Sequence, residues 1–233
     1  MPELLIFQNI GLSDAATGGQ TSTVGEPSIA NSGQRIFVTG NWYATRSLDN
    51  GVSWDFISPF NALPPVDDGF CCDQTVLYDY SHDLMFWLLQ YVEKNGTNTL
   101  RVAVNTSGTL GNNEWYWWDF RPQEVNSQWQ GEWFDYNHAA LSNNYLYVAT
   151  NVFRGDNWTR SVVLRLPLDS LAAGGALNYN YFQSTDNFSL RCAQGARDVM
   201  HFGSHNSNSQ IRVFSWPENN TAFAAVMRYS SNK

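Results

Sequence analysis

Short stretches in which aromatic or β-branched residues alternate with polar residues recur along the whole chain, and turn-forming residues separate them. Alternation with a period of two is typical of β-strands that bury one face. The pattern predicts fifteen strands, in groups of four, four, four and three. They cover residues 26–30, 35–39, 43–47, 54–57, 73–78, 84–92, 100–104, 115–120, 135–141, 145–150, 161–166, 178–182, 198–202, 211–216 and 222–227.

The run at residues 84–89 is apolar at every position, so periodicity alone fits either a buried strand or a buried helix. Its Trp87 and the neighbouring strand at residues 100–104 favour a strand in the middle of a sheet that is covered on both faces. A short helix is expected only at residues 168–175, where two glycines end the apolar pattern.

The four groups start at residues 26, 73, 135 and 198, at steps of 47 to 63 residues, and the added length falls in loops. A β-propeller repeats a four-stranded antiparallel blade with a period of about 40 to 50 residues. The chain is therefore predicted to be all-β, with about four blades of a β-propeller. The predicted blades span residues 26–60, 73–120, 135–182 and 198–233, after an N-terminal strand and loop at residues 1–25.

The turn between the third and fourth predicted strands reads Ser-Leu-Asp-Asn-Gly-Val-Ser-Trp. Asp49 can accept hydrogen bonds from N–H groups of the turn, and Gly51 can adopt a positive φ. Ser47 can brace the loop from inside, and Trp54 can bury its ring beneath it. The spacing Ser-x-Asp-x-Gly-x-x-Trp resembles the Asp-box, or BNR repeat, of the sialidase-like β-propeller superfamily.

The resemblance implies architecture more than chemistry, because the box joins the third and fourth strands of a blade, away from the active site. It also implies six or more blades, so that the chain would be the N-terminal part of a larger propeller with further C-terminal blades. The alternative is a compact four-bladed ring, in which residues 4–8 supply the missing outer strand of the fourth blade. The resemblance favours an extracellular or periplasmic protein, although residues 1–7 do not read as a signal peptide.

The composition is informative mainly about the partners and sites that it argues against. With 21 acidic and 13 basic side chains, the net charge is −8, which argues against nucleic acid as a partner because phosphate binding needs clustered Lys and Arg. No apolar run approaches the roughly 18 residues of a membrane-spanning helix, so a soluble chain is expected. Cys71, Cys72 and Cys192 lack zinc-type spacing, and the vicinal pair is interpreted as packing groups rather than a redox pair.

The inner strands of a propeller all begin at one rim of its central funnel, so the residues at the head of each unit should converge. Those residues are Glu26, Asp73, Asp135 and Asp198. Carboxylates that face one channel repel one another, which raises some of their pKa values unless a cation such as Arg197 compensates.

Two of these acids are followed three residues later by a histidine, as Asp135–His138 and Asp198–His201. In a strand, positions i and i+3 point to opposite faces, so each pair serves one site only where the strand has a bulge. One interpretation is structural, with the acids capping loops and the histidines packed between blades. The other is catalytic, with the four acids and both histidines as acid–base groups at the funnel mouth.

The polar loop before the third unit, residues 121–134, is the most ligand-like segment. Trp129 and Trp133 can stack on the apolar faces of sugar rings, while Glu132 binds hydroxyl groups. Tyr136, which follows the loop, is grouped with this candidate carbohydrate-binding site. The alternative is that both tryptophans seal the gap between the second and third blades.

The arginine triad, the Tyr–Glu nucleophile pair and the aspartic acid that a sialidase requires are not traceable, and the residues leave open whether the chain is an enzyme. The main hypothesis is therefore a carbohydrate-interacting propeller without a sialidase catalytic set, whose partner is a glycan or polysaccharide. A glycoside hydrolase or polysaccharide lyase acting through the strand-head carboxylates is the alternative, and a protein-binding scaffold is a third. No cofactor or metal is predicted.

Overall fold

Four four-stranded antiparallel sheets make up the computed structural model, which describes residues 25–220 and 225–230. The sheets follow one another along the chain, and the strands of each sheet pair in sequence order. Sheet 1 contains β1 (Ser28–Ser32), β2 (Arg35–Thr39), β3 (Ala44–Ser47) and β4 (Asp55–Ile57). Sheet 2 contains β5 (Phe70–Asp79), β6 (Leu84–Tyr91), β7 (Leu100–Thr106) and β8 (Tyr116–Phe120). Sheet 3 contains β9 (Trp133–Leu141), β10 (Tyr145–Arg154), β11 (Asn157–Pro167) and β12 (Asn180–Ser184). Sheet 4 contains β13 (Arg191–Cys192), β14 (Val199–Ser207), β15 (Gln210–Pro217) and β16 (Ala225–Ser230).

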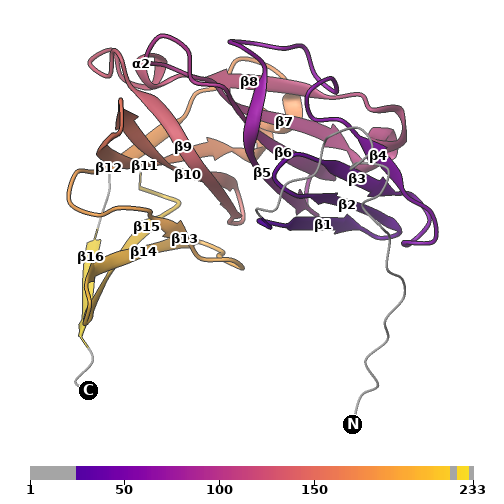
Figure 1. Cartoon of the computed structure of the whole chain (residues 1–233). Coiled ribbons are helices and arrows are strands. Elements are labelled where there is room, and N and C mark those ends of the chain that lie inside the picture. Colours follow the sequence, from indigo (N-terminus) through magenta and orange to yellow (C-terminus); the bar gives the residue numbers. More distant parts are fainter. Residues whose placement is uncertain (1–24, 221–224, 231–233) are drawn as a thin grey trace.

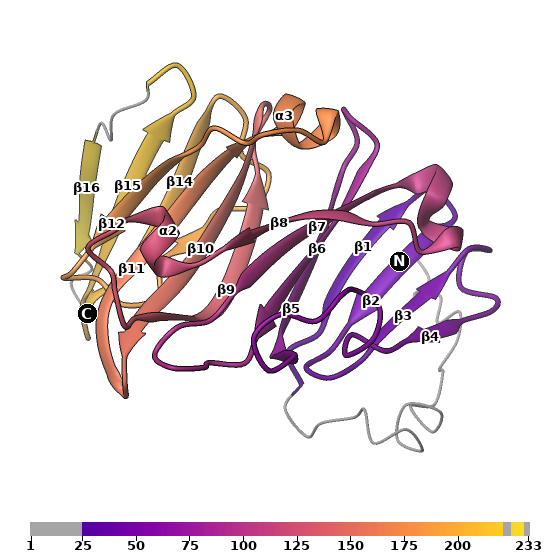
Figure 2. The same cartoon turned by 90° about the horizontal axis from the view of Figure 1, so that it is seen from above.

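The four sheets stand next to one another as the blades of a propeller, and Figures 1 and 2 show this arrangement from two directions. The first strands β1, β5, β9 and β13 are neighbours in succession, so the starts of the four sheets are brought together. Within the described residues no strand of sheet 1 pairs with a strand of sheet 4, so the ring is open there. The predicted fold class is confirmed as an all-β partial propeller with four blades.

The middle strands of sheets 2 and 3 are buried on both faces, and β6 shows why. All eight of its residues are buried. Phe86 and Leu88 pack in the cluster shared with sheet 3, whereas Met85 and Trp87 pack against sheet 1. Because successive side chains point to opposite faces, the unbroken apolar run at residues 84–89 belongs to a strand with a blade on each side, as predicted.

Arginine side chains from the third strands are also buried between the blades. Arg101 on β7 is only 1% exposed, and its Nε and Nη2 donate to the two carboxylate oxygens of Asp119 at 2.7 and 2.8 Å. Its guanidinium also lies over the ring of Tyr91, 4.7 Å from the centroid. On β11, Arg165 lies over the ring of Trp216 at 4.4 Å. Paired carboxylates and aromatic faces thus compensate for the lost hydration of these cations.

The Ser47–Trp54 turn joins β3 and β4, the third and fourth strands of sheet 1, which is the position that the Asp-box resemblance implies. Ser53 donates from its backbone N–H and its hydroxyl to Asp49, at 2.8 and 2.6 Å, and these bonds are the main reason that the pKa of Asp49 is lowered to about 2. Gly51 has a φ of 87° and its N–H donates to Ser47 Oγ at 2.8 Å. The Trp54 indole donates to the Gly51 carbonyl. The turn is thereby rigid.

A histidine connects sheet 2 to the helix that follows β11. The helix α3 (Leu168–Ala173) is the one predicted, and it ends at Gly174 in the left-handed conformation. His82 Nδ1 lies 2.6 Å from Asp79 Oδ2, and its Nε2 lies 2.9 Å from Asp169 Oδ1 in α3. Burial opposes the charged imidazole, but the hydrogen bonds to Asp169 and Asp79 outweigh it and raise the pKa of His82.

Two further helical turns, η1 (Ser107–Asn112) and α2 (Pro122–Val125), were not predicted. Sheet 4 also differs from the prediction, because its first strand is the two-residue β13 and not the segment that starts at residue 198. The segment after Asp198 is the second strand, β14. Residues 1–24, including the alternative closing strand at residues 4–8, lie outside the described residues. In the described ranges no helix has the length and apolar character needed to cross a membrane.

Candidate functional site

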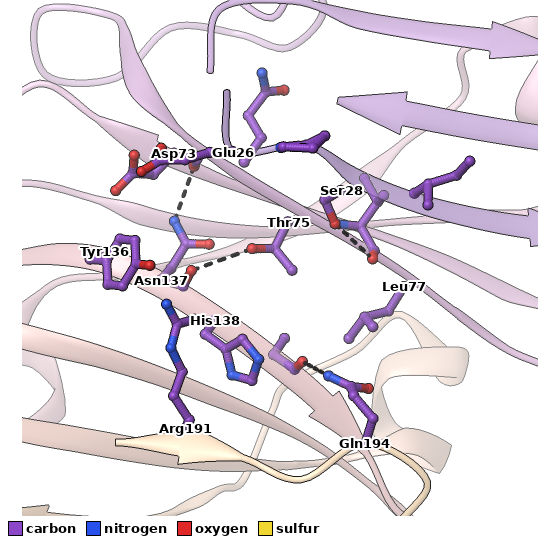
Figure 3. A pocket seen from close by; sticks show the side chains of 15 residues that line it. Glu26, Ser28, Asp73, Thr75, Leu77, Tyr136, Asn137, His138, Arg191 and Gln194 are labelled. Carbon is purple, nitrogen blue, oxygen red and sulfur yellow. Dashed lines mark hydrogen bonds between the residues drawn. The ribbon is translucent and has the colours of Figure 1, made fainter. Parts of the chain in front are cut away.

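A cavity of about 440 Å³ lies along the first strands of the four sheets. Every sheet contributes to its lining, either from its first strand or from the segment next to that strand. Figure 3 shows the lining side chains, of which the polar ones used below are Glu26, Asp73, Tyr136, His138, Arg191 and Gln194. The convergence expected from propeller geometry therefore produces a defined cavity.

Side chains tie the first strands to one another along this wall. Asn137 on β9 donates from Nδ2 to the carbonyl of Asp73 on β5 at 3.0 Å, and Thr75 Oγ1 donates back to the Asn137 carbonyl at 3.4 Å. Gln194, just after β13, donates to the Ala139 carbonyl at 2.9 Å. The dashed lines in Figure 3 mark these bonds. Neighbouring blades are thus held in fixed relation at the point where the cavity forms.

Three of the four predicted strand-head acids come together, one from each of the first three sheets. Asp73 is partly buried, and burial raises its pKa to about 7, with further contributions from the negative charges of Glu26 and Asp135. Asn41 donates to Glu26 Oε2 at 3.2 Å, and Gln90 donates to Asp135 Oδ1 at 3.0 Å. Near neutral pH, Asp73 can therefore hold a proton beside carboxylates that accept hydrogen bonds from amides.

The backbone at this cluster adopts conformations that side chains usually avoid. Glu26, Asp73 and Tyr136 have φ values of 37°, 38° and 56°. Such left-handed conformations cost non-glycine residues about 1–3 kcal/mol each and occur preferentially at functional sites. In β9 the register shifts between Asp135 and His138, which is the bulge that the sequence requires if both residues are to serve one site.

His138 lines the cavity as a neutral imidazole. Burial lowers its pKa to about 4, and the positive charge of Arg191 adds to the effect. Its Nδ1 is buried and has no hydrogen-bond partner among the described residues. At neutral pH this side chain is therefore suited to hydrogen bonding with a ligand, and not to donating a proton as imidazolium.

Arg191 is the residue of this site that the sequence did not reveal. It lines the cavity from β13, and its guanidinium lies 4.4 Å from the ring centroid of Tyr136. Arg197, the cation considered from the sequence, is exposed before β14 and does not line the cavity. Because β13 has only two residues, no alternation marks it as a strand, and no other signal in the sequence points to Arg191.

The vicinal cysteines next to Asp73 form a disulfide, Cys71–Cys72, instead of the separate packing groups expected from the sequence. β5 shifts register on both sides of Cys72, so the disulfide lies within the irregular segment that directs Asp73. Gln90 Nε2 lies 4.0 Å from Cys72 Sγ and 3.0 Å from Asp135 Oδ1. The disulfide is therefore one contact away from a second acid of the cluster.

Asp198 and His201 do not join the other predicted catalytic residues, which corrects the expected convergence. Asp198 accepts a hydrogen bond from Asn143 at 2.8 Å and does not line the cavity. His201 is exposed on β14 and pairs with Ser215 of β15. Both precede or belong to the second strand of sheet 4, whereas the cavity is built from first strands.

The rim loop also differs from its carbohydrate-binding interpretation. Trp129 is only 3% exposed and lies beneath the guanidinium of Arg160 at 4.7 Å. Glu132 is 1% exposed and forms ion pairs with Arg154 and Arg160 at 3.2 and 3.0 Å. Neither has the free surface that a sugar contact needs, and for Trp129 this burial agrees with the alternative in which the tryptophans seal the gap between two blades.

Two other members of that predicted group keep accessible surface. Trp133 is partly buried; it stacks on Phe153 with ring centroids 5.2 Å apart, and its indole donates to the Gly155 carbonyl. Tyr136 is 39% exposed and borders the cavity. Of the four residues, only Tyr136 therefore lies beside the acid cluster.

No group of three or more His, Cys, Asp or Glu side chains in residues 25–220 and 225–230 is placed to hold a metal ion. No family model and no curated protein matches the chain. Among solved structures, it is similar to a mutant of the alpha-L-arabinanase of Cellvibrio cellulosa, with a TM-score of 0.46 and 12% identity over 83% of this chain and 70% of that one.

Two further solved structures are similar to the same degree. The GH43 endo-arabinanase from Bacillus licheniformis has a TM-score of 0.46 and 9% identity, over 89% of this chain and 93% of that one. An ACO/RPE65 chimera has a TM-score of 0.46 and 10% identity, over 87% of this chain and 47% of that one. Likenesses of this degree assign no activity and no residue role to the chain.

Proposed function

We propose that the chain cleaves glycosidic bonds by acid–base catalysis with the carboxyl groups of Glu26, Asp73 and Asp135. The observation that supports this function is the Asp73 carboxyl, whose pKa is raised to about 7 by burial and by its two acidic neighbours. Glycoside hydrolases generally use two carboxyl groups, one that donates a proton and one that acts as a base or nucleophile. The acid cluster offers both forms near neutral pH.

In the proposed reaction, Asp73 gives its proton to the glycosidic oxygen while the bond from that oxygen to the anomeric carbon breaks. Glu26 or Asp135, in its ionised form, takes a proton from a water molecule, and the water oxygen bonds to the anomeric carbon. Exchange with solvent then returns both carboxyl groups to their starting states. The net change is the addition of one water across one glycosidic bond.

The lining of the cavity supports a sugar as the group that is bound. It combines the exposed ring of Tyr136 with hydrogen-bonding side chains, among them His138, whose Nδ1 has no partner within the described part of the chain. Sugars present apolar C–H faces and hydroxyl rims, which match such a mixture. The cavity volume of about 440 Å³ is within the range of small-molecule sites.

The test is release of reducing ends from a panel of polysaccharides and aryl glycosides by the whole chain. Asp73→Asn should lower kcat by at least about a hundredfold, and so should whichever of Glu26→Gln and Asp135→Asn removes the base, since acid–base groups contribute about that much or more. Asp198→Asn is the matched control, because it removes a predicted strand-head acid that lies outside the acid cluster and is bonded to Asn143. Activity that survives all three cluster substitutions would refute the assignment.

A second candidate is a non-catalytic glycan-binding propeller that uses the same cavity. The exposure of Tyr136 beside the cavity favours it, and it predicts glycan binding that persists in the three cluster variants while no bond is cleaved.

Membership of the Asp-box, sialidase-like superfamily is a further proposal. It is supported by the position and hydrogen bonds of the turn between β3 and β4, which concern architecture and not the cavity.

A further inference from the structure

Two buried polar atoms in the lining of the cavity have no hydrogen-bond partner among the described residues. They are Asn137 Oδ1 and His138 Nδ1, which belong to successive residues of β9. The other buried side-chain atoms without a partner in that part of the chain belong to residues that do not line the cavity. Buried polar atoms are normally paired, because an unpaired one has lost its hydration without replacement. The two exceptions in the lining therefore point to a group that the cavity receives.

Asn137 is the more constrained of the two residues. It is only 6% exposed, so bulk water does not compensate its amide oxygen. Its Nδ2 donates to the Asp73 carbonyl at 3.0 Å, and the Thr75 hydroxyl donates to its backbone carbonyl at 3.4 Å. Figure 3 shows the amide beside Asp73, with its oxygen directed away from Asp73 and toward the side of Thr75. These bonds fix the direction in which the oxygen points.

A second asparagine that bridges sheets 2 and 3 is fully paired by the protein. Asn98 Nδ2 donates to the carbonyls of Tyr91 and Phe134 at 3.2 and 2.8 Å, and its Oδ1 accepts the Phe134 N–H at 2.7 Å. An asparagine that only joins two blades can therefore use both ends of its amide. Asn137 uses the nitrogen end for this purpose and leaves the oxygen in the cavity wall.

The two unpaired atoms select among ligand groups by their hydrogen-bonding roles. An amide oxygen can only accept, so its partner must be a donor. The pKa of His138 is lowered to about 4, chiefly by burial, and the neutral ring donates at one nitrogen and accepts at the other. A hydroxyl group donates and accepts, and it satisfies either atom, whereas a carboxylate or phosphate oxygen would meet Asn137 Oδ1 as a second acceptor.

We propose that Asn137 determines which sugar the cavity accepts, by taking a hydrogen bond at Oδ1 from one hydroxyl group of the sugar unit beside Asp73. The amide is bonded to the backbone of Asp73, so the recognised hydroxyl group belongs to the unit whose glycosidic oxygen receives the proton of that carboxyl group. The inference rests on the proposed function and deepens it by naming a specificity-determining residue, but the binding step can be measured without cleavage.

The binding test uses NMR titration at pH 7 of the whole chain carrying Asp73→Asn, which is expected not to turn the ligand over. The first probes are the methyl glycosides of glucose, galactose, mannose, xylose and arabinose. The sugar that binds most tightly is then compared with its monodeoxy and monodeoxyfluoro derivatives. At one position, loss of the hydroxyl group should weaken binding about tenfold to a hundredfold, because Asn137 Oδ1 is left unpaired again. Fluorine at that position should not restore binding, since it cannot donate.

Removal of the amide in the same background completes a double-mutant cycle. With Asn137→Ala added, the penalty for the deoxy sugar at that position should fall below about twofold, since the group that senses the hydroxyl is gone. A role of Asn137 only in joining the blades would instead weaken the parent sugar and its deoxy derivative by the same factor. Asn143→Ala is the matched control, because this exposed asparagine bonds to Asp198 and does not line the cavity; the penalty should be unchanged.

Circular dichroism establishes that each variant is folded, and if Asn137→Ala is not, the comparison of sugars decides alone. The inference is overturned if none of the five glycosides binds, if no single deoxy position costs more than about twofold, or if the penalty survives Asn137→Ala. Position-specific binding without cleavage by the unsubstituted chain would support the inference while refuting the proposed hydrolysis. Cleavage that depends on Asp73 but treats the parent glycoside and all its deoxy derivatives alike would do the reverse.

Discussion

Replacing Asp73 by asparagine should make the protein more stable at neutral pH, although it removes a carboxyl group that lines the cavity. In the folded chain the pKa of Asp73 is raised from 3.8 to about 7, mainly by burial and then by the charges of Glu26 and Asp135. Between these two pH values, the folded state holds a proton that the unfolded state has released. The unsubstituted protein therefore loses stability as pH rises from about 4 to 7, and the loss is complete above pH 7.

The size of this loss follows from the shift. Three pKa units correspond to about 4 kcal/mol, and partial exposure of the carboxyl to screening solvent reduces this to about 2 kcal/mol. Asparagine mimics the protonated carboxyl and cannot ionise. Asp73→Asn and the unsubstituted chain should therefore be about equally stable near pH 4, whereas the variant should be about 2 kcal/mol more stable at pH 8.

Urea unfolding at pH 4, 5, 6, 7 and 8, followed by tryptophan fluorescence, measures this difference, since titrating groups outside the acid cluster cancel between the two chains. Asp49→Asn provides a control of opposite sign. The pKa of Asp49 is lowered to about 2 by hydrogen bonds from Ser53, so this substitution should lower stability at neutral pH and have a smaller effect as pH falls toward 2. If the curves of Asp73→Asn and the unsubstituted chain run parallel from pH 4 to 8, Asp73 does not retain its proton and the proposed proton donor is wrong.

Three other changes have definite expected results. Asp119→Ala should lower the free energy of unfolding by about 3 kcal/mol in urea titrations, because it leaves the buried guanidinium of Arg101 without its carboxylate; a loss under 1 kcal/mol would contradict this. His82→Gln should flatten the dependence of stability on pH above pH 6.5, since the raised pKa of His82 gives stability that is present below that pH and lost as pH rises through the folded value. Reduction of Cys71–Cys72 by a dithiol should titrate two new thiols and lower kcat on any substrate found, with recovery on reoxidation; unchanged kcat after full reduction would show that the disulfide does not position Asp73.

The sequence predicts the fold well where strands are long enough to carry a pattern. The apolar run at residues 84–89 could be placed between two blades because its tryptophan and its neighbouring strand favour a sheet over a helix. The fourth sheet shows the limit, since β13 has two residues and alternation needs more. Without a signal for β13, the pattern predicts the segment of β14 as the first strand and so places Asp198 with the converging acids.

The candidate site also contains some residues that the sequence reveals and others that it does not. Glu26, Asp73 and Asp135 can be predicted because each begins a first strand that the alternation pattern marks, although β5 and β9 start a few residues earlier. The burial of Trp129 cannot be predicted, because a polar loop with tryptophans has the same composition whether the rings face solvent or lie under an arginine. Which of the two occurs depends on Arg160, a residue more than twenty positions away. No local pattern contains that information.

The left-handed backbone at Glu26, Asp73 and Tyr136 has a consequence for attempts to improve this protein. Glycine adopts such torsions freely, so a substitution to glycine at these positions relieves strain and, at the two acids, also removes electrostatic repulsion. Directed evolution that selects only for heat resistance should therefore replace these three residues in its first rounds. A library that is screened for ligand binding as well as for thermal stability should yield a more stable variant that keeps its cavity.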